Sequence, residues 1–266
     1  MPINCSFPIR NLTQAEFDER DRVVMRCAYA SQNALGRMCD ERVYETDVAL
    51  RLRAEGMRNV QTQTPVTVTH EGFEKVYRLD LLADDAHYEL KTVAALVSQH
   101  DAQALHYAML AGVNHAKLLN FRPSKVQGRL RFNVMMPPER RRLVWDESRW
   151  RSLSSRCESL HLRLRSLMKD WGGFLDVRLY EEALVHFCGG EAQVLRRVPI
   201  RRDGIELGTH QMNLHESGLG FIVTSFQNSR DQRSHFQRLV AQTEIRAVQW
   251  FNVHGGVVEC TTLAKP

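Results

Sequence analysis

The stretch VYRLDLLADDAHYELKTV, residues 76–93, decides the fold of this chain. Apolar and polar residues alternate on both sides of a central ADDA, which is the pattern of a two-stranded hairpin with a tight turn. Because side chains on a strand alternate between faces, we expect Glu89 and Lys91 on one face and Leu90 on the other. Asp80 lies on the paired strand. Two acids and a lysine therefore converge in an apolar element, and burying such charges is costly unless they pair or bind a cation.

The composition is that of a soluble globular protein. The chain has 266 residues, of which 43% are hydrophobic and 25% charged, and this length predicts about two domains or one large one. No apolar run approaches the ~20 residues of a membrane span, and the N-terminal sequence shows no signal-peptide core. Six cysteines are scattered without a CxxC pair. We therefore expect neither a zinc site nor disulfides, and a reducing cytoplasm is the simplest location.

The net charge of +5 comes mainly from arginine, which supplies 30 of the 36 basic residues. Residues 1–133 carry 17 basic and 16 acidic groups, whereas residues 134–266 carry 19 and 15. Arginine forks suit phosphate, so the second half is a candidate nucleic-acid surface. A genome that favours arginine codons, together with charged side chains that only face solvent, explains the excess of arginine equally well.

Helical and strand patterns surround the hairpin. Thr13 followed by Glu16 is a capping box that begins a helix, and Gly56 is a stop signal for a second helix. The expected elements in chain order are helices over 13–36 and 40–55, a strand over 63–70, the two hairpin strands, a helix over 98–111 and a strand over 117–121. This order predicts an α/β fold with a mixed sheet.

A repeat divides the chain into two. Pro137-Pro138, followed by four charged residues, predicts a junction between domains over 1–136 and 137–266. The stretch WGGFLDVRLYEEAL, residues 171–184, aligns with the sequence around residues 35–50 at an offset of 136, and FIVTS aligns with YELKT at an offset of 133. The identical pairs in the first alignment include Gly36 and Gly172, Asp40 and Asp176, Arg42 and Arg178, Tyr44 and Tyr180, and Glu45 and Glu181. We interpret the chain as a tandem repeat of one unit of roughly 130 residues.

The second copy lacks the charged residues of the first. The corresponding pairs are Asp80 and Asn213, Glu89 and Ile222, Lys91 and Thr224, and Glu41 and Val177. Apolar framework positions persist in both copies. We infer that the fold depends on these apolar residues and does not depend on the acids. The first copy must hold its acids for another reason.

Five ordered motifs cover about residues 12–128. They are Glu41-x-x-Tyr44, Tyr77-Arg78-Leu79-Asp80, Glu89-Leu90-Lys91, Gln103-x-x-x-Tyr107 and Leu118-Leu119-Asn120-Phe121. Together they resemble the GxxExxY family of the PD-(D/E)XK nuclease superfamily, although Met38 stands where that family has its naming glycine, with Gly36 nearby. The resemblance implies a restriction-endonuclease-like αβββαβ core, present twice in tandem, with a degenerate second copy.

The acids of the first copy have the chemistry of a metal site. Glu41, Asp80 and Glu89 supply three hard carboxylate ligands, which suit Mg²⁺ or Mn²⁺. Such an ion lowers the pKa of a bound water and polarises a phosphoryl oxygen. The resemblance implies that these acids bind the metal together with the Leu90 carbonyl, and that Lys91 orients the water or stabilises charge on the phosphate.

Gln103 and Tyr107 lie four residues apart and share one helix face, so both can reach the same place. The resemblance implies that they position the acids or the nucleic-acid backbone. Plainer interpretations stay open, because Gln103 and Tyr107 could be only a hydrogen-bonded pair. Similarly, Asp80, Glu89 and Lys91 could form a structural ion-pair cluster.

The other polar residues have less specific signals. We expect His87 to be a solvated residue at a strand edge. Arg78 either pairs with Asp80 or contacts phosphate, and the arginine run Arg140, Arg141 and Arg142 is expected to contact nucleic acid. The remaining histidines of the first copy show no ligand spacing and are expected on the surface or in the core: His100, His106 and His115.

The sequence thus predicts a metal-dependent nuclease that hydrolyses phosphodiester bonds, more plausibly of DNA, through one active centre in the first repeat. The second repeat would replace a dimer partner and form an intramolecular pseudo-dimer. The alternative is a catalytically silent subunit that binds nucleic acid or protein in a DNA-processing or defence complex. Neither hypothesis requires a membrane, and both allow partner proteins.

Overall fold

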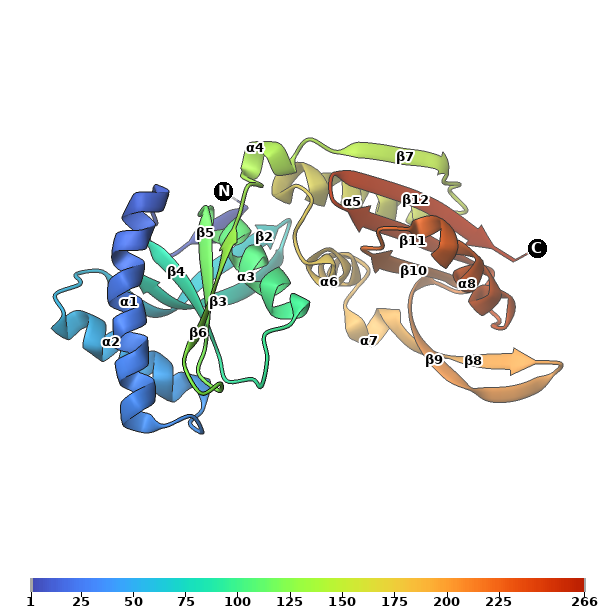
Figure 1. Ribbon diagram of the computed structural model, residues 1–266. Coiled ribbons are helices and arrows are strands. Elements are labelled where there is room, and N and C mark those ends of the chain that lie inside the picture. The colour runs from blue at the N-terminus through green and yellow to red at the C-terminus, as the bar shows by residue number, and fades with distance from the viewer. Residues whose placement is uncertain (1, 266) are drawn as a thin grey trace. The chain divides into compact units, whose positions relative to one another are not determined.

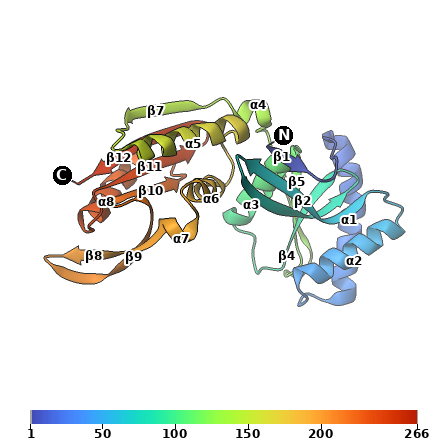
Figure 2. The same cartoon turned by 180° about the vertical axis from the view of Figure 1, so that it is seen from behind.

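A computed structural model describes residues 2–265 (Figures 1 and 2). The chain divides into two compact units, Met1–Pro137 and Pro138–Pro266, called unit 1 and unit 2 below. Each unit contains one six-stranded mixed sheet with helices packed on it. The predicted α/β class is therefore confirmed.

Unit 1 contains the predicted helices and strands and two further strands. Its elements are β1 (Ile3–Cys5), α1 (Gln14–Leu35), α2 (Glu41–Ala54), β2 (Val60–His70), β3 (Phe73–Ala83), β4 (Ala86–Lys91), α3 (Ser98–Ala111), β5 (His115–Asn120) and β6 (Gln127–Phe132). The sheet order is β1-β2-β3-β4-β5-β6. Only β4 and β5 are parallel, because α3 carries the chain across between them. The two edge strands, β1 and β6, were not predicted.

Two local sequence signals of unit 1, the capping box at Thr13 and the turn after β3, form the expected structures. Thr13 caps α1 in a capping box with Glu16. The hairpin turn holds Asp84 and Asp85 at φ values of 45° and 74°, in the left-handed region that a two-residue hairpin turn requires. Aspartate tolerates this region better than most residues. The turn therefore fixes the register Ala83↔Ala86.

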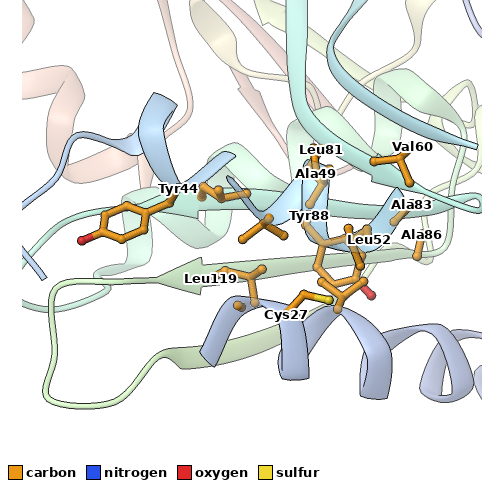
Figure 3. Close-up of a cluster of buried hydrophobic side chains, with 14 of the residues drawn as sticks. Cys27, Tyr44, Ala49, Leu52, Val60, Leu81, Ala83, Ala86, Tyr88 and Leu119 are labelled. Atoms are coloured by element: carbon orange, nitrogen blue, oxygen red, sulfur yellow. The ribbon is translucent and has the colours of Figure 1, made fainter. Parts of the chain in front are cut away.

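The core of unit 1 lies between the sheet and the pair α1 and α2. Tyr88 and Leu90 of β4 are buried there with Cys27, Tyr44 and Leu52 of the helices (Figure 3). The opposite face of β4 carries Glu89, and its neighbours on β5 belong to a second core cluster under α3. The predicted alternation of the hairpin is thus confirmed, and the acid lies on the α3 side of the sheet.

Unit 2 repeats this architecture. Its elements are α4 (Pro137–Arg140), β7 (Val144–Arg149), α5 (Ser155–Trp171), α6 (Val177–Phe187), α7 (Glu191–Val194), β8 (Leu195–Arg202), β9 (Ile205–Glu216), β10 (Leu219–Thr224), α8 (Ser229–Ala241), β11 (Ala247–His254) and β12 (Val257–Ala264). The sheet order is β7-β12-β11-β10-β9-β8, and β10 and β11 are parallel. Strands β8 to β12 follow the order of β2 to β6. The extra edge strand differs, because β1 pairs with β2 whereas β7 pairs with β12.

One tyrosine contact is repeated between the first two helices of each unit. The Tyr44 hydroxyl donates to the Gly36 carbonyl at 2.7 Å, and the Tyr180 hydroxyl donates to the Gly172 carbonyl at 2.7 Å. Both glycines end the preceding helix with positive φ values, 75° and 78°. The aligned residues therefore perform the same structural task in both units.

An asparagine contact is repeated at the end of the parallel strand pair. Asn120 Nδ2 donates to the Val93 carbonyl at 2.8 Å, and Asn252 Nδ2 donates to the Phe226 carbonyl at 2.9 Å. Together with the shared topology, this contact shows the αβββαβ core twice in the chain.

All four tryptophans of the chain lie in unit 2: Trp145, Trp150, Trp171 and Trp250.

Candidate active site

The two strands of the hairpin separate at the predicted acids. The β3–β4 ladder runs from the turn to Leu81↔Tyr88 and stops there. Continued by one pair, it would join Asp80 to Glu89. Instead, the Leu90 amide donates to Asp80 Oδ2 at 2.9 Å. A side-chain carboxylate thus replaces a backbone acceptor, and the acids lie where the sheet opens.

Glu89 is fully buried and only half satisfied. Its Oε1 lies 3.0 Å from His87 Nε2, whereas its Oε2 has no hydrogen-bond partner. The Lys91 ammonium is 3.6 Å from Glu89 Oε2 and 3.9 Å from Asp80 Oδ2. Burial and the negative charge of Asp80 raise the pKa of Glu89 well above its usual range, against an opposing effect of Lys91. Such a carboxyl ionises readily only when further positive charge arrives.

The expectation that His87 is solvated was wrong. Its side chain is completely buried, because β4 lies in the middle of the sheet and not at its edge. Burial, and to a lesser degree the charge of Lys91, lowers the pKa of His87 to about 3. The imidazole is therefore neutral at physiological pH and acts as a fixed hydrogen-bond partner of Glu89.

Helix α2 brings two acids to this opening, of which one was predicted. Glu41 Oε1 accepts a hydrogen bond from the Thr92 amide at 3.1 Å, directly after Lys91. Glu45, one turn further along, is 4% exposed. Its pKa is raised by burial first, with smaller contributions from the charges of Asp80 and Glu41. The repeat alignment marked Glu45 as shared with Glu181 but gave no reason to place it at the site.

Gln63 connects the acid of α2 to that of β3. Its Nε2 donates to Glu45 Oε2 at 2.5 Å and to Asp80 Oδ1 at 3.3 Å. The β2–β3 ladder skips this residue, and its φ of 53° lies in the left-handed region. Glutamine rarely adopts that conformation, which costs of the order of 1 kcal/mol. Sequence analysis missed Gln63, because its position in the strand pattern is unremarkable.

Helix α3 brings Gln103 and Tyr107 to the same region. Gln103 Nε2 donates to the Tyr107 hydroxyl at 3.5 Å, and both side chains are partly buried. The pKa of Tyr107 is raised by burial and also by the charges of Glu89 and Asp80. The negative charges of Glu89 and Asp80 therefore act on the Tyr107 hydroxyl. A role of Gln103 and Tyr107 in positioning the acids stays a prediction.

The arginines predicted to contact nucleic acid differ in exposure. Arg78 is exposed and donates to the Gln63 carbonyl at 3.4 Å, and within residues 2–265 it forms no ion pair with Asp80. Arg140 is only 2% exposed, so its assignment as a phosphate contact was wrong. Helix α4 packs this side chain against Gly172, where an added Cβ would clash with it. Arg141 and Arg142 are exposed.

The corresponding place in unit 2 lacks counterparts of the acids Asp80 and Glu89 but keeps Glu181, the counterpart of Glu45. The Trp250 indole donates to Thr224 Oγ1 at 2.7 Å, and Ile222 packs against the core that contains Trp250. Asn213 Nδ2 donates to Glu181 Oε1 at 2.8 Å. Polar groups here are satisfied within the protein, whereas Glu89 Oε2 in unit 1 is not.

The donor set of unit 1 fits a hard divalent cation. Carboxylates of Glu41, Asp80 and Glu89 border the gap between the strands, and one buried oxygen of Glu89 accepts no hydrogen bond. Oxygen ligands of this kind hold Mg²⁺ or Mn²⁺ together with water. The partly unsatisfied carboxylate is the group that such an ion would neutralise.

Within residues 2–265, Glu41, Asp80 and Glu89 do not bring three ligand atoms within 4.8 Å of one another. The group that does so lies in unit 2, and its ligands are already satisfied. Ligand atoms of Glu147, His161 and Cys260 lie within 4.8 Å of one another. His161 Nε2 contacts Glu147 Oε1 at 2.6 Å, and Arg165 binds the same oxygen. The arginine neutralises the carboxylate and would repel a cation. All six thiols are free, in agreement with the expectation of no disulfides.

Unit 1 thus combines a mixed sheet that opens beside Asp80 and the E-x-K strand with two acids from the neighbouring helix α2. In agreement, residues 18–132 match the family model of the PD-(D/E)XK nuclease superfamily. No curated protein and no solved structure matches the chain. No helix in the described part of the chain is long and apolar enough to cross a membrane. The narrower GxxExxY resemblance stays a prediction.

Proposed function

We propose that unit 1 is a Mg²⁺- or Mn²⁺-dependent nuclease that hydrolyses phosphodiester bonds, with DNA as the expected substrate. The observation that carries this proposal is Glu89 Oε2, which is buried beside Asp80 where the strands separate and accepts no hydrogen bond. Unit 2 builds the same fold without these charges. The acids of unit 1 therefore serve a purpose other than folding.

Each residue of the proposed site has a task that follows from its contacts. Glu41, Asp80 and Glu89 would hold the cation, with the Leu90 carbonyl as a further ligand. The bound ion would supply a water of lowered pKa and polarise the phosphate. Lys91 lies within 4 Å of two of these acids and is placed to donate to the attacking water or to an oxygen on which charge develops.

Other residues position these groups. His87 fixes one oxygen of Glu89, while the Leu90 amide and Gln63 fix both oxygens of Asp80. Gln103 and Tyr107 are proposed to position the acids or the substrate from α3. Exposed Arg78, Arg141 and Arg142 are proposed phosphate contacts.

Unit 2 is proposed to be a degenerate copy that takes the role of a dimer partner in a pseudo-dimer. It has no carboxylate at the positions of Asp80 and Glu89, where Asn213 and Ile222 stand. The chain then has one active centre, which cuts one strand in each event.

The test is cleavage of single- and double-stranded DNA and RNA with Mg²⁺ or Mn²⁺. Glu89→Gln and Lys91→Ala should abolish cleavage without loss of folding, because both remove charges that act only at the site. Thr224→Ala is the matched control, since it changes the unit 2 counterpart of Lys91, and it should cleave like wild type. Wild-type protein that cuts none of these substrates would instead favour the silent binding subunit.

A further inference from the structure

Each unit has a pocket between three parts: its first long helix, the end of its second long helix, and the end of the second strand of its core. In unit 2 this pocket has a volume of about 370 Å³ and lies between α5, the end of α6 and β9. In unit 1 the pocket has about 290 Å³ and lies between α1, the end of α2 and the turn after β3. The repeat thus provides a pair of corresponding pockets whose charges can be compared.

The unit 1 pocket is lined by both acids and arginines, and its arginines are bonded within the protein. Glu19, Glu55 and Asp84 line it together with Arg20 and Arg26. Arg26 forms an ion pair with Glu55 at 2.5 Å, and Arg20 Nε donates to the Asp84 carbonyl at 2.7 Å. These arginines are therefore occupied within the protein.

The acids are absent from the corresponding positions of unit 2. The offset of 136 that aligns the two helix-ending glycines places Glu19 on Ser155 and Arg20 on Arg156. Cys188 caps the end of α6 as Glu55 caps the end of α2. The hairpin offset of 133 places Asp84 on Ser217. Three carboxylates are replaced by neutral residues, while one arginine is kept.

Several hydrogen-bond donors line the unit 2 pocket. None of the lining residues in the described chain is an aspartate or glutamate. Arg156 is exposed and donates one N–H to the His215 carbonyl at 3.4 Å, so most of its fork is available. The Arg163 guanidinium lies over the Phe187 ring, 5.0 Å from its centroid. The Ser159 hydroxyl and the Gln193 amide add neutral donors.

A buried histidine adds a second indication of a ligand. His215 lines the pocket, is 7% exposed, and has an Nδ1 without a hydrogen-bond partner. Its Nε2 faces Cys157 Sγ at 3.8 Å, and that sulfur accepts from Gln249 at 3.3 Å. The thiol can therefore donate to Nε2, which leaves the proton of the neutral ring on Nδ1.

We propose that this pocket of unit 2 binds a phosphate group carried by a nucleotide or by the end of a nucleic-acid strand. Arginine forks match phosphate oxygens in geometry and charge. A pocket of this size lies in the range that binds small ligands. The site is separate from the proposed metal centre and needs neither a metal nor cleavage, so it stands or falls independently of the nuclease activity.

The test measures binding to the full-length protein in EDTA by calorimetry, with inorganic phosphate, AMP, and one oligonucleotide with or without a 5′-phosphate. Wild type should bind phosphate, and Arg156→Gln should bind about tenfold more weakly or worse, because a charge-assisted hydrogen bond is lost. Arg20→Gln, at the matched position of unit 1, should bind like wild type. Ser159→Glu, which returns a carboxylate to the pocket, should abolish binding.

The outcomes separate the sources of the phosphate. Tighter binding of AMP than of the phosphorylated oligonucleotide would assign the site to a free nucleotide, and the reverse order would assign it to a strand end. Wild-type protein that binds none of the phosphorylated probes overturns the proposal. Equal weakening in Arg20→Gln and Arg156→Gln also overturns it, because the effect would then reflect net charge alone.

Discussion

Asp80 Oδ2 accepts a hydrogen bond from the Leu90 amide at 2.9 Å, just beyond Leu81 and Tyr88, the last paired residues of the hairpin. This bond lets β3 and β4 separate without leaving a buried amide unsatisfied. The same carboxylate therefore supports the sheet and faces the gap in which a cation would lie. Its structural and chemical roles can be separated by substitution.

Asp80→Asn should keep the acceptor for the Leu90 amide, whereas Asp80→Ala should lose it. We expect Asp80→Ala to lower the free energy of unfolding of unit 1 by about 1–3 kcal/mol, the cost of an unsatisfied buried donor. Asp80→Asn should unfold close to wild type in urea and yet fail to cleave. Equal stability of the two variants would show that the Leu90 contact contributes nothing.

Glu89→Gln should remove the response of unit 1 to a divalent cation. In wild type, saturating Mn²⁺ at about 100 times its Kd should stabilise the folded state by about 2.7 kcal/mol. In EDTA the variant should be at least as stable as wild type, because a carboxyl with a raised pKa no longer has to be buried. Thermal melts with Mn²⁺ and with EDTA measure both effects. A variant that Mn²⁺ still stabilises fully would exclude Glu89 as a ligand.

His87 should make unit 1 sensitive to acid. Its pKa is lowered to about 3 by burial, so the unfolded chain takes up a proton below about pH 6.5 and the folded chain does not. Stability is complete above that pH and is lost as the pH falls, by up to about 1.4 kcal/mol per unit. Urea unfolding in EDTA at pH 7 and pH 5 should show a smaller fall for His87→Gln. Parallel losses in both proteins would contradict the assignment.

Gln63→Gly should separate backbone strain from side-chain positioning. Glycine adopts the φ of 53° without penalty, so the backbone should be relieved while the contacts to Glu45 and Asp80 are lost. We expect metal affinity to fall about tenfold, as is usual for groups that orient ligands, with little loss of stability. Calorimetric titration with Mn²⁺ tests this. Unchanged affinity would make Gln63 a purely structural residue.

A single active centre should leave a kinetic signature on supercoiled plasmid. Nicked circles should accumulate before linear DNA appears, because each event cuts one strand. Gel analysis of a time course with monodisperse protein measures this order. Direct conversion to linear DNA by a monomer would refute the proposal of one centre in a pseudo-dimer.

The sequence predicted those features that depend on neighbouring residues. The hairpin, the capping box at Thr13 and the repeated Tyr44 and Tyr180 positions follow from local patterns, and the structure contains all of them. Strand order is not local, so the burial of His87 in the middle of the sheet was not foreseen.

The missed site residues depend on long-range contacts as well. Gln63 and Glu45 meet Asp80 across elements that are 17 or more residues apart in sequence. Arg140 belongs to a charged run, but a short helix turns its side chain inward. Charge runs predict exposure on average and say little about a single member.

The placement of the tryptophans gives the two units separate optical signals. All four indoles lie in unit 2, whereas unit 1 absorbs ultraviolet light mainly through tyrosines. Excitation at wavelengths that only indole absorbs therefore reports on unit 2 alone, where Trp250 lies beside Ile222 and Thr224, the counterparts of Glu89 and Lys91. Unfolding of unit 1, the proposed catalytic unit, would not change the tryptophan fluorescence but would change the far-ultraviolet circular dichroism. One unlabelled sample can thus show which half of the molecule responds to a cation and which responds to phosphate.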